Sequence, residues 1–385
     1  MLALVATLAI QALVSMTVLT PPVLAALAAP EIGVASERVG LFTALVYGGA
    51  IVSSAGSGAL LARTGPLRLS QWCLVFCAAG IAVASAGSLA LVVLGAVLMG
   101  LGYGPVTPAS SHILIRQTAP QRRSLVFSLK QTGVPVGGAL AGSVAAPLAL
   151  LLGWRGAALA VAAASLVLAF AVEPLRPRFD AGDASDAGPS LGLLAGIRLV
   201  LRTPTLRRLA LSSTTFSATQ LSFATFVVTF LTERANVPLV TAGVVMAVAQ
   251  GAGVVGRIVL GWAADRLLPP GRLLALLGIG MAAAATATGF IGSGWPLSAI
   301  FAVTAACWRA LIVSYATKRY RSASYPARSA ASGSPNNPTK AYPHTIIASA
   351  PFVNSPCTCA GWDIPPMCRI DRSRQSALAV SHHAS

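Results

Sequence analysis

A small set of polar side chains stands inside the long apolar stretches of this 385-residue sequence. Polar groups in apolar surroundings are costly and often serve function, so these residues are the first candidates for binding a solute. The set includes one lysine, whose charge would attract an anion. Hydrogen bonding between helices and, for the lysine, a side chain that snorkels to a membrane surface are the alternatives. The residues are Gln11, Tyr47, Tyr103, Thr107, Lys130, Gln220 and Gln250.

The sequence has no constellation typical of an enzyme. It contains no nucleotide-binding loop and no nucleophile paired with a base. Three cysteines and a histidine near the C-terminus could be taken for zinc ligands, but their C-x-C-x8-C spacing is not that of a zinc site. We therefore expect no enzymatic activity, no metal and no cofactor. These four residues are Cys357, Cys359, Cys368 and His344.

The composition places most of the chain in a membrane. Hydrophobic residues make up 55% of it, charged residues 10%, and the mean hydropathy is +0.76. These values are typical of multi-spanning membrane proteins and lie outside the range of soluble domains. The net charge of +17 would suggest nucleic-acid binding in a soluble protein. Here the basic residues fall in short gaps between apolar runs, where they set topology, so lipid and not nucleic acid is the expected partner.

Ten apolar runs are long enough to cross a hydrocarbon core about 30 Å thick at about 1.5 Å per residue. All are predicted to be helices, because lipid offers the backbone no hydrogen-bond partner. The first run is too long for a signal peptide and lacks a positive n-region, so a retained helix is expected. The runs are Leu2–Leu27, Gly40–Ala62, Leu69–Ala86, Leu89–Ile115, Leu125–Gly153, Trp154–Val172, Leu209–Leu231, Leu239–Ala264, Leu273–Ile291 and Pro296–Tyr315.

Arginines are unevenly distributed between the gaps. The gaps after the second, fourth, sixth and eighth runs hold thirteen arginines, whereas the others hold three, Arg38, Arg155 and Arg234. By the positive-inside rule, this asymmetry predicts a cytoplasmic N-terminus. The longest gap, 173–208, is then a cytoplasmic linker. Its segment FDAGDASDAGPS is turn-forming, and LGLLAGIRLVLRTPTLRR is predicted to form an amphipathic basic helix on the inner leaflet.

Two stretches that begin 203 residues apart are alike. GALLARTGPLR begins at Gly58, and GWAADRLLPPGR begins at Gly261, each at the end of an apolar run. This arrangement resembles the G-x-x-x-D-R-x-G-R signature found once in each half of the twelve-helix transporters of the major facilitator superfamily. KQTGVPVGGALAG, residues 130–142, is similar to the glycine- and proline-rich motif in the fifth helix of that family. The helix-packing residues of this motif are Gly133, Pro135, Gly137, Gly138 and Gly142.

The resemblance covers about residues 1–315 and implies an all-α membrane bundle of two six-helix repeats, of which the second is incomplete at about ten helices in total. It divides the chain into a six-helix half at 1–172, a linker at 173–208, an incomplete second half of four helices at 209–315 and a polar tail at 316–385.

The same resemblance implies a conformational latch at the cytoplasmic ends of the helices. Asp265 can interact with the positive N-terminus of an adjoining helix, and an arginine can pair across the two halves, so that contacts form in one conformation and break in the other. A simple stop charge is the alternative. Where the family has aspartate in the first half, this chain has Ala62. The predicted latch residues are Gly58, Arg63, Gly261, Asp265 and Arg266.

In the superfamily, helices one, four, seven and ten line the central cavity, and helices two, five, eight and eleven lie beside them. No Asp or Glu lies in the middle of an apolar run, so the buried carboxylate that carries protons in many relatives is not visible. His112 titrates in the right range for coupling but is given little weight, and Arg257 is expected to snorkel. The resemblance therefore ranks Gln11, Tyr103, Thr107 and Gln220 first as solute contacts, with Tyr47 and Gln250 next.

These features predict secondary active transport of a small organic solute by a monomer in the inner membrane of a bacterium, with a proton or an ion as the candidate for coupling. Lys130 favours an anionic solute, whereas drug or metabolite efflux is favoured by the breadth of the family. A membrane protein with this fold but no transport, either a sensor or the product of a damaged gene, is the other hypothesis.

The tail bears on that choice. Helices eleven and twelve are expected at about 328–356 and 357–375, but those segments are too polar to span a bilayer. From Trp308 to Ser385, only ten of the 78 residues are Leu, Ile or Val. We expect a truncated transporter whose reading frame broke near Cys307 to Tyr315, with a disordered or non-native tail. An authentic disordered regulatory tail is the alternative.

Overall fold

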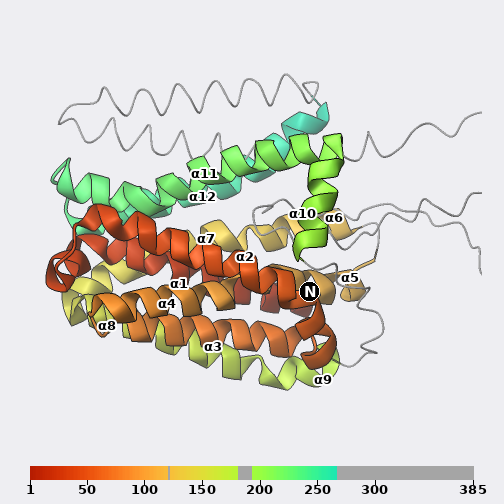
Figure 1. Ribbon diagram of the computed structural model, residues 1–385, viewed down its shortest axis with the longest axis horizontal. Helices are drawn as coiled ribbons and strands as arrows, with labels where there is room; N and C mark the ends of the chain where they lie inside the picture. The colour runs from red at the N-terminus through yellow and green to blue at the C-terminus, as the bar shows by residue number, and fades with distance from the viewer. Residues whose placement is uncertain (120–121, 181–192, 267–385) are drawn as a thin grey trace, which may run out of the picture.

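The computed structural model describes residues 1–119, 122–180 and 193–266, which form helices and helical turns and no strand. Most of the helices lie side by side along the long axis of the molecule (Figure 1). Within these residues, five helical stretches are long and apolar enough to cross a membrane, and the fifth contains two helices joined by a turn. The predicted all-α membrane protein is therefore confirmed. The stretches are Leu2–Ile32, Ser36–Thr64, Pro66–Ala84, Leu89–Gln117 and Val126–Phe179.

The predicted runs that fall within the described residues are all helical, with ends that differ by a few residues. In chain order the helices of the first half are α1 (Leu2–Ile32), α2 (Val39–Thr64), α3 (Pro66–Ala84), α4 (Leu89–Tyr103), α5 (Val106–Gln117), α6 (Arg123–Gln131), α7 (Gly133–Leu140) and α8 (Ala146–Ala171). The helices that follow are α9 (Arg176–Phe179), α10 (Leu193–Arg202), α11 (Pro204–Glu233) and α12 (Leu239–Arg266).

The fourth and fifth predicted runs are each interrupted, at positions where the sequence weakens the helix. Pro105 has no N–H to donate and lies in the turn between α4 and α5. Pro135 likewise removes the bond to the carbonyl of Gln131, the residue at which α6 ends. A π-helical turn, η3 (Ala141–Ala145), connects α7 to α8. The chain then reverses within α8 at Gly153, where φ is 71°, at the predicted boundary between the fifth and sixth runs.

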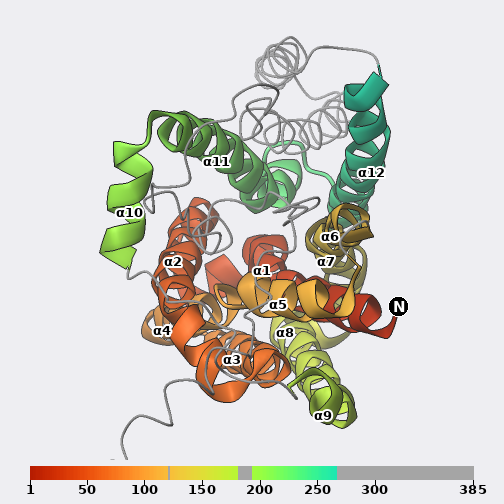
Figure 2. The ribbon, with the colours of Figure 1, turned by 90° about the vertical axis from the view of Figure 1, so that its right-hand side faces the viewer.

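The second half is represented by α11 and α12, which lie on one side of the first-half bundle (Figure 2). They pack against α1, α2 and α7, and α1 occupies the centre of the bundle. The predicted amphipathic segment of the linker forms α10, on which Arg198 and Arg202 are exposed together with Ile197 and Leu201. The ninth and tenth predicted runs and the tail lie outside the described residues.

The buried apolar side chains form two clusters at opposite ends of the bundle. One cluster, toward the end that contains Gly153, combines residues of the first half with residues of α11 and α12. The other lies toward the N-terminus, and its described members come from α1, α3, α5, α6, α8, α9 and the segment around Val172. Among the side chains that the structure describes, the two halves therefore share an apolar core at one end only.

Candidate functional site

The glycine-rich segment of α7 and η3 is a contact surface for two helices at once. A Cβ atom at Gly137 would clash with the backbone carbonyl of Ala12 on α1, whereas one at Gly138 would clash with the side-chain amide of Gln250 on α12. The remaining glycines extend each row by one helical turn, because residues four apart share a helix face. Gly133 faces α1, and a Cβ atom at Gly142 would clash with the carbonyl of Gly243 on α12. Bare backbone on both faces lets α1 and α12 pack closely against α7.

Two of the candidate solute contacts lie along this surface, and a third lies just before it. Gln11 on α1 is 2% exposed. A Cβ atom at Gly133 would lie 3.0 Å from the Cβ of Gln11. Its Nε2 donates a long hydrogen bond of 3.5 Å to the Oγ of Ser15, and its Oε1 has no hydrogen-bond partner among the described residues. Gln250 on α12 is 3% exposed. One amide side chain from each half therefore approaches α7.

Lys130 is buried inside the protein. Its side chain is 1% exposed, although it is among the largest in the chain, and it lies three residues before Gly133. A snorkelling lysine would leave its ammonium group at the surface, which this burial does not fit. Gln131 and Thr132, the next residues, are also buried.

The two candidate tyrosines are in contact. The rings of Tyr47 on α2 and Tyr103 on α4 meet edge to face, with centroids 5.4 Å apart and planes at 63°. Thr107 lies one turn further along, on α5, and is half-buried. Gln220 is half-buried and lies near the middle of α11. His112 on α5 is also half-buried.

The predicted latch residues are only partly described. Arg63 is exposed at the end of α2, and Gly58 is half-buried one and a half turns earlier. Gly261, Asp265 and Arg266 belong to the last turns of α12, but their side chains, like that of Arg257, lie outside the described residues.

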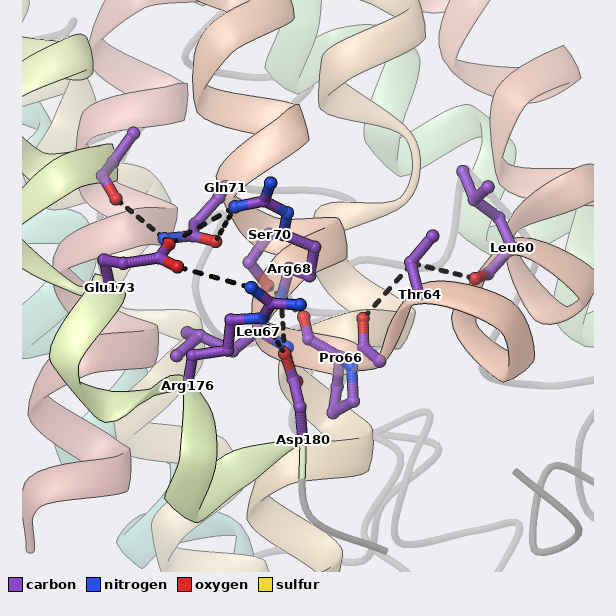
Figure 3. A network of polar contacts seen from close by, with 12 residues as sticks. Leu60, Thr64, Pro66, Leu67, Arg68, Ser70, Gln71, Glu173, Arg176 and Asp180 are labelled. Atoms are coloured by element: carbon purple, nitrogen blue, oxygen red, sulfur yellow. Dashed lines mark hydrogen bonds and ion pairs between the residues drawn. The ribbon is translucent and has the colours of Figure 1, made fainter. Parts of the chain in front are cut away.

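A polar network that the sequence analysis missed lies next to the first-half signature (Figure 3). The carboxylate of Asp180 accepts hydrogen bonds from the backbone N–H groups of Leu67 at 2.7 Å and Arg68 at 3.2 Å. These N–H groups belong to the first turn of α3 and have no partner within that helix. Asp180 therefore caps α3 from a distant part of the chain, and its negative charge lies at the positive end of the helix.

The signature glycine makes this contact possible. Gly65 has φ of 86°, which disfavours other residues, and a Cβ atom there would lie 2.6 Å from the Cγ of Asp180. Partial burial raises the pKa of the Asp180 carboxyl, and the two N–H groups and the nearby arginines offset part of that rise. Glu173 extends the network, because its carboxylate accepts from Gln71 at 2.6 Å and pairs with Arg68 at 3.3 Å.

In addition to the contacts between α7 and α12, the two halves meet at the Gly153 end. The Oγ1 of Thr225 on α11 donates a hydrogen bond of 3.3 Å to the Oγ1 of Thr43 on α2. One turn away, a Cβ atom at Gly40 would lie 2.7 Å from the ring of Phe226. Both pairs lie beside the apolar cluster that joins the halves.

The fold and these sites define a class, a multi-pass helical membrane protein whose two sets of helices meet around α1 and α7. The family model of the Major Facilitator Superfamily matches residues 4–334, and the chain belongs to that family of membrane transporters. The match includes the beginning of segment 316–385. Among the described residues, no group of three His, Cys, Asp or Glu could hold a metal ion.

Individual relatives agree with this assignment. An MFS-type efflux pump of Mycolicibacterium smegmatis is 32% identical over 195 residues, which are 49% of this chain and 43% of the relative. The match thus spans less than half of that curated protein. A bacterial homologue of the human lysosomal transporter Spinster, solved in an inward-facing and occupied conformation, has a TM-score of 0.65 at 17% identity, over 93% of this chain and 80% of its own. The peptide transporter POT in complex with sulfate has a TM-score of 0.64 at 16% identity, over 93% and 87%.

Proposed function

We propose that this chain is a secondary active transporter that moves a small organic anion by alternating access. The observation that carries the proposal is the burial of Lys130 next to the helix surface where the two halves meet. A buried ammonium group creates a positive potential in low-dielectric surroundings, where charges act more strongly than in water. Such a potential favours an anionic solute. Gln11 and Gln250, which approach α7 from opposite halves, would donate hydrogen bonds to it.

The distribution of contacts supports alternating access. The described side chains form an apolar core between the halves at the Gly153 end, where Thr43 and Thr225 are hydrogen-bonded. The arginine asymmetry of the loops favours a cytoplasmic N-terminus in a bacterial inner membrane, which would make the Gly153 end the outer one. We infer that this conformation is closed to the outside. Transport then requires these contacts to break as the two bundles rock. We expect a monomer to suffice, with a proton or an ion coupled to the solute.

The test is uptake into proteoliposomes of a panel of labelled carboxylates and sulfonates, with amines and neutral solutes for comparison. We expect Lys130→Gln to abolish uptake of the anion that the wild type transports, and Lys130→Arg to retain part of it. Arg116→Gln is the matched control, because it removes a charge from an exposed position on α5. Equal loss in Lys130→Gln and Arg116→Gln, or wild-type uptake confined to cations and neutral solutes, would contradict the proposed anion site.

Drug or metabolite efflux is the second candidate function. The observation that favours it is the relative in M. smegmatis, which is named as an efflux pump. Inverted membrane vesicles distinguish the two directions, because an exporter accumulates solute in inverted vesicles and an importer does so in right-side-out vesicles.

A chain with this fold and no transport remains the third candidate, and it rests on the polar composition of 316–385. Translation of the two other reading frames after the codon for Ala306 tests the proposed break. A frame that encodes two further apolar helices would support it, and frames rich in stop codons would contradict it.

A further inference from the structure

A cavity of about 350 Å³ lies at the Gly153 end of the first half, apart from the α7 surface. Its walls come from the end of α1, the beginning of α2, the end of α3, the beginning of α4 and the part of α8 that follows Gly153. They are almost entirely apolar, with Leu24, Phe42 and Ile81 among the buried lining residues. The volume lies within the range of small-molecule sites.

The exposed part of the cavity lining faces away from α11. Leu41 and Leu45 on α2 and Leu89 and Val93 on α4 line it and are exposed, Leu41 to 67%. At 3.6 residues per turn, Leu45 lies roughly opposite the face of α2 that carries Gly40 and Thr43, which contact α11. In a membrane-spanning bundle, an apolar face that points away from the other helices faces the hydrocarbon. The exposed lining residues of α2 and α4 therefore face one leaflet of the membrane.

Two polar groups flank the apolar cavity. Trp154 lines it and is 7% exposed, and its Nε1–H has no hydrogen-bond partner among the described residues. A buried donor without an acceptor is costly, so an oxygen atom of a bound molecule would stabilise it. Arg38 also lines the cavity, at the turn before α2, and it is exposed and absent from the ion pairs formed by described residues. The other nearby arginine, Arg155, forms an ion pair with Glu31 at 3.0 Å, and its guanidinium group lies over the Trp154 ring.

We propose that this cavity binds one acyl chain of a glycerophospholipid from the leaflet at the Gly153 end. The chain would enter between α2 and α4, its ester carbonyl would accept the hydrogen bond of Trp154, and its phosphate would pair with Arg38. Tryptophan is common at the depth of lipid ester groups, and guanidinium groups bind phosphate well. The lining thus combines an apolar surface, an N–H donor and a cation, the three features that the chain, the ester group and the phosphate of a phospholipid require.

The test uses purified protein in vesicles of phosphatidylcholine that contain phosphatidylglycerol with a photoreactive diazirine in its acyl chain. Peptide mapping after illumination should find the label on segments 24–45, 81–93 and 154–158. Ala28→Phe places a ring on a lining residue and should lower labelling several-fold. Ala44→Phe is the matched control, because Ala44 is exposed on α2 and does not line the cavity. Equal labelling of the two variants, or label spread evenly over all membrane-facing helices, would overturn the proposal.

A second variant tests the head group and does not depend on filling the cavity. Arg38→Gln should lower labelling by the phosphatidylglycerol probe several-fold. It should change labelling little with a diacylglycerol probe that has the same chain and no phosphate. An equal effect on the two probes would overturn the assigned role of Arg38. Because the cavity is separate from Lys130, failure here would leave the proposed solute transport untouched.

Discussion

The Oδ1 atom of Asp180 lies 2.7 Å from the backbone nitrogen of Leu67, although 113 residues separate the two in sequence. The bond joins a residue in the first part of the linker to the first turn of α3, directly after the first-half signature. The chain that leaves the first half is therefore fixed to the helix that follows α2. A displacement of the linker would act on the position of α3.

Removal of this cap should destabilise the protein. Asp180→Ala leaves the N–H groups of Leu67 and Arg68 without their acceptor, and loss of a helix cap costs about 0.5–2 kcal/mol. Thermal unfolding in detergent, followed by circular dichroism, should show a lower midpoint. Asp180→Asn keeps one acceptor oxygen, so its unfolding midpoint should fall less than that of Asp180→Ala. Equal midpoints for wild type and Asp180→Ala would show that the contact does not stabilise the fold.

The packing role of the α7 glycines can be tested by comparison with a glycine that has open space around it. Gly137→Ala and Gly138→Ala each place a methyl group in contact with α1 or α12, and such overpacking costs about 1–3 kcal/mol. Gly48→Ala on α2 is the control, because no atom lies within 4 Å of its Cβ position. It should be neutral or slightly stabilising. Unfolding midpoints that fall equally in all three variants would contradict the packing role.

The hydrogen bond between Thr43 and Thr225 offers a way to lock the halves together. A disulfide between Thr43→Cys and Thr225→Cys should block transport until a reductant is added, because alternating access separates these residues. The control pair is Thr17→Cys and Ser165→Cys, whose native hydroxyls are 2.9 Å apart within the first half. That disulfide should form without blocking transport. Undiminished transport by the cross-linked Thr43 and Thr225 variant would exclude movement at this contact.

The latch prediction concerns Asp265. Asp265→Asn removes the charge proposed to interact with a helix N-terminus, so it should shift the balance between the two conformations by about 1–3 kcal/mol. Accessibility of single cysteines on the two sides of the bundle measures that balance. A change in unfolding midpoint with no change in accessibility would indicate a structural role only.

The orientation is tested by labelling intact cells with an impermeant thiol reagent. Asn236→Cys, in the turn between α11 and α12, should react, and Ser185→Cys in the linker should not. A variant without the native cysteines measures the background labelling. Two of the native cysteines, Cys73 and Cys77, are buried. The reverse pattern would place the N-terminus outside.

Within the described residues, the predicted runs are helical because a long apolar stretch in a membrane must satisfy its backbone hydrogen bonds internally. The predicted boundary between the fifth and sixth runs falls at Gly153, and the φ of 71° at that residue explains how the chain reverses there. The interruption at Pro135 was missed because the apolar run continues through it. The contact between Tyr47 and Tyr103 and the cap by Asp180 could not be predicted, since each depends on how distant helices pack.

The reversal at Gly153 has a practical consequence for reagents that must reach this end of the molecule. The two parts of α8 meet directly at Gly153, and Leu150, Leu151 and Leu152 are exposed just before this turn. Antibodies and proteases need a few residues of extended chain, which this hairpin does not offer. An epitope tag inserted there would break two helices. The turns before α2 and before α12 offer longer connections for such a tag.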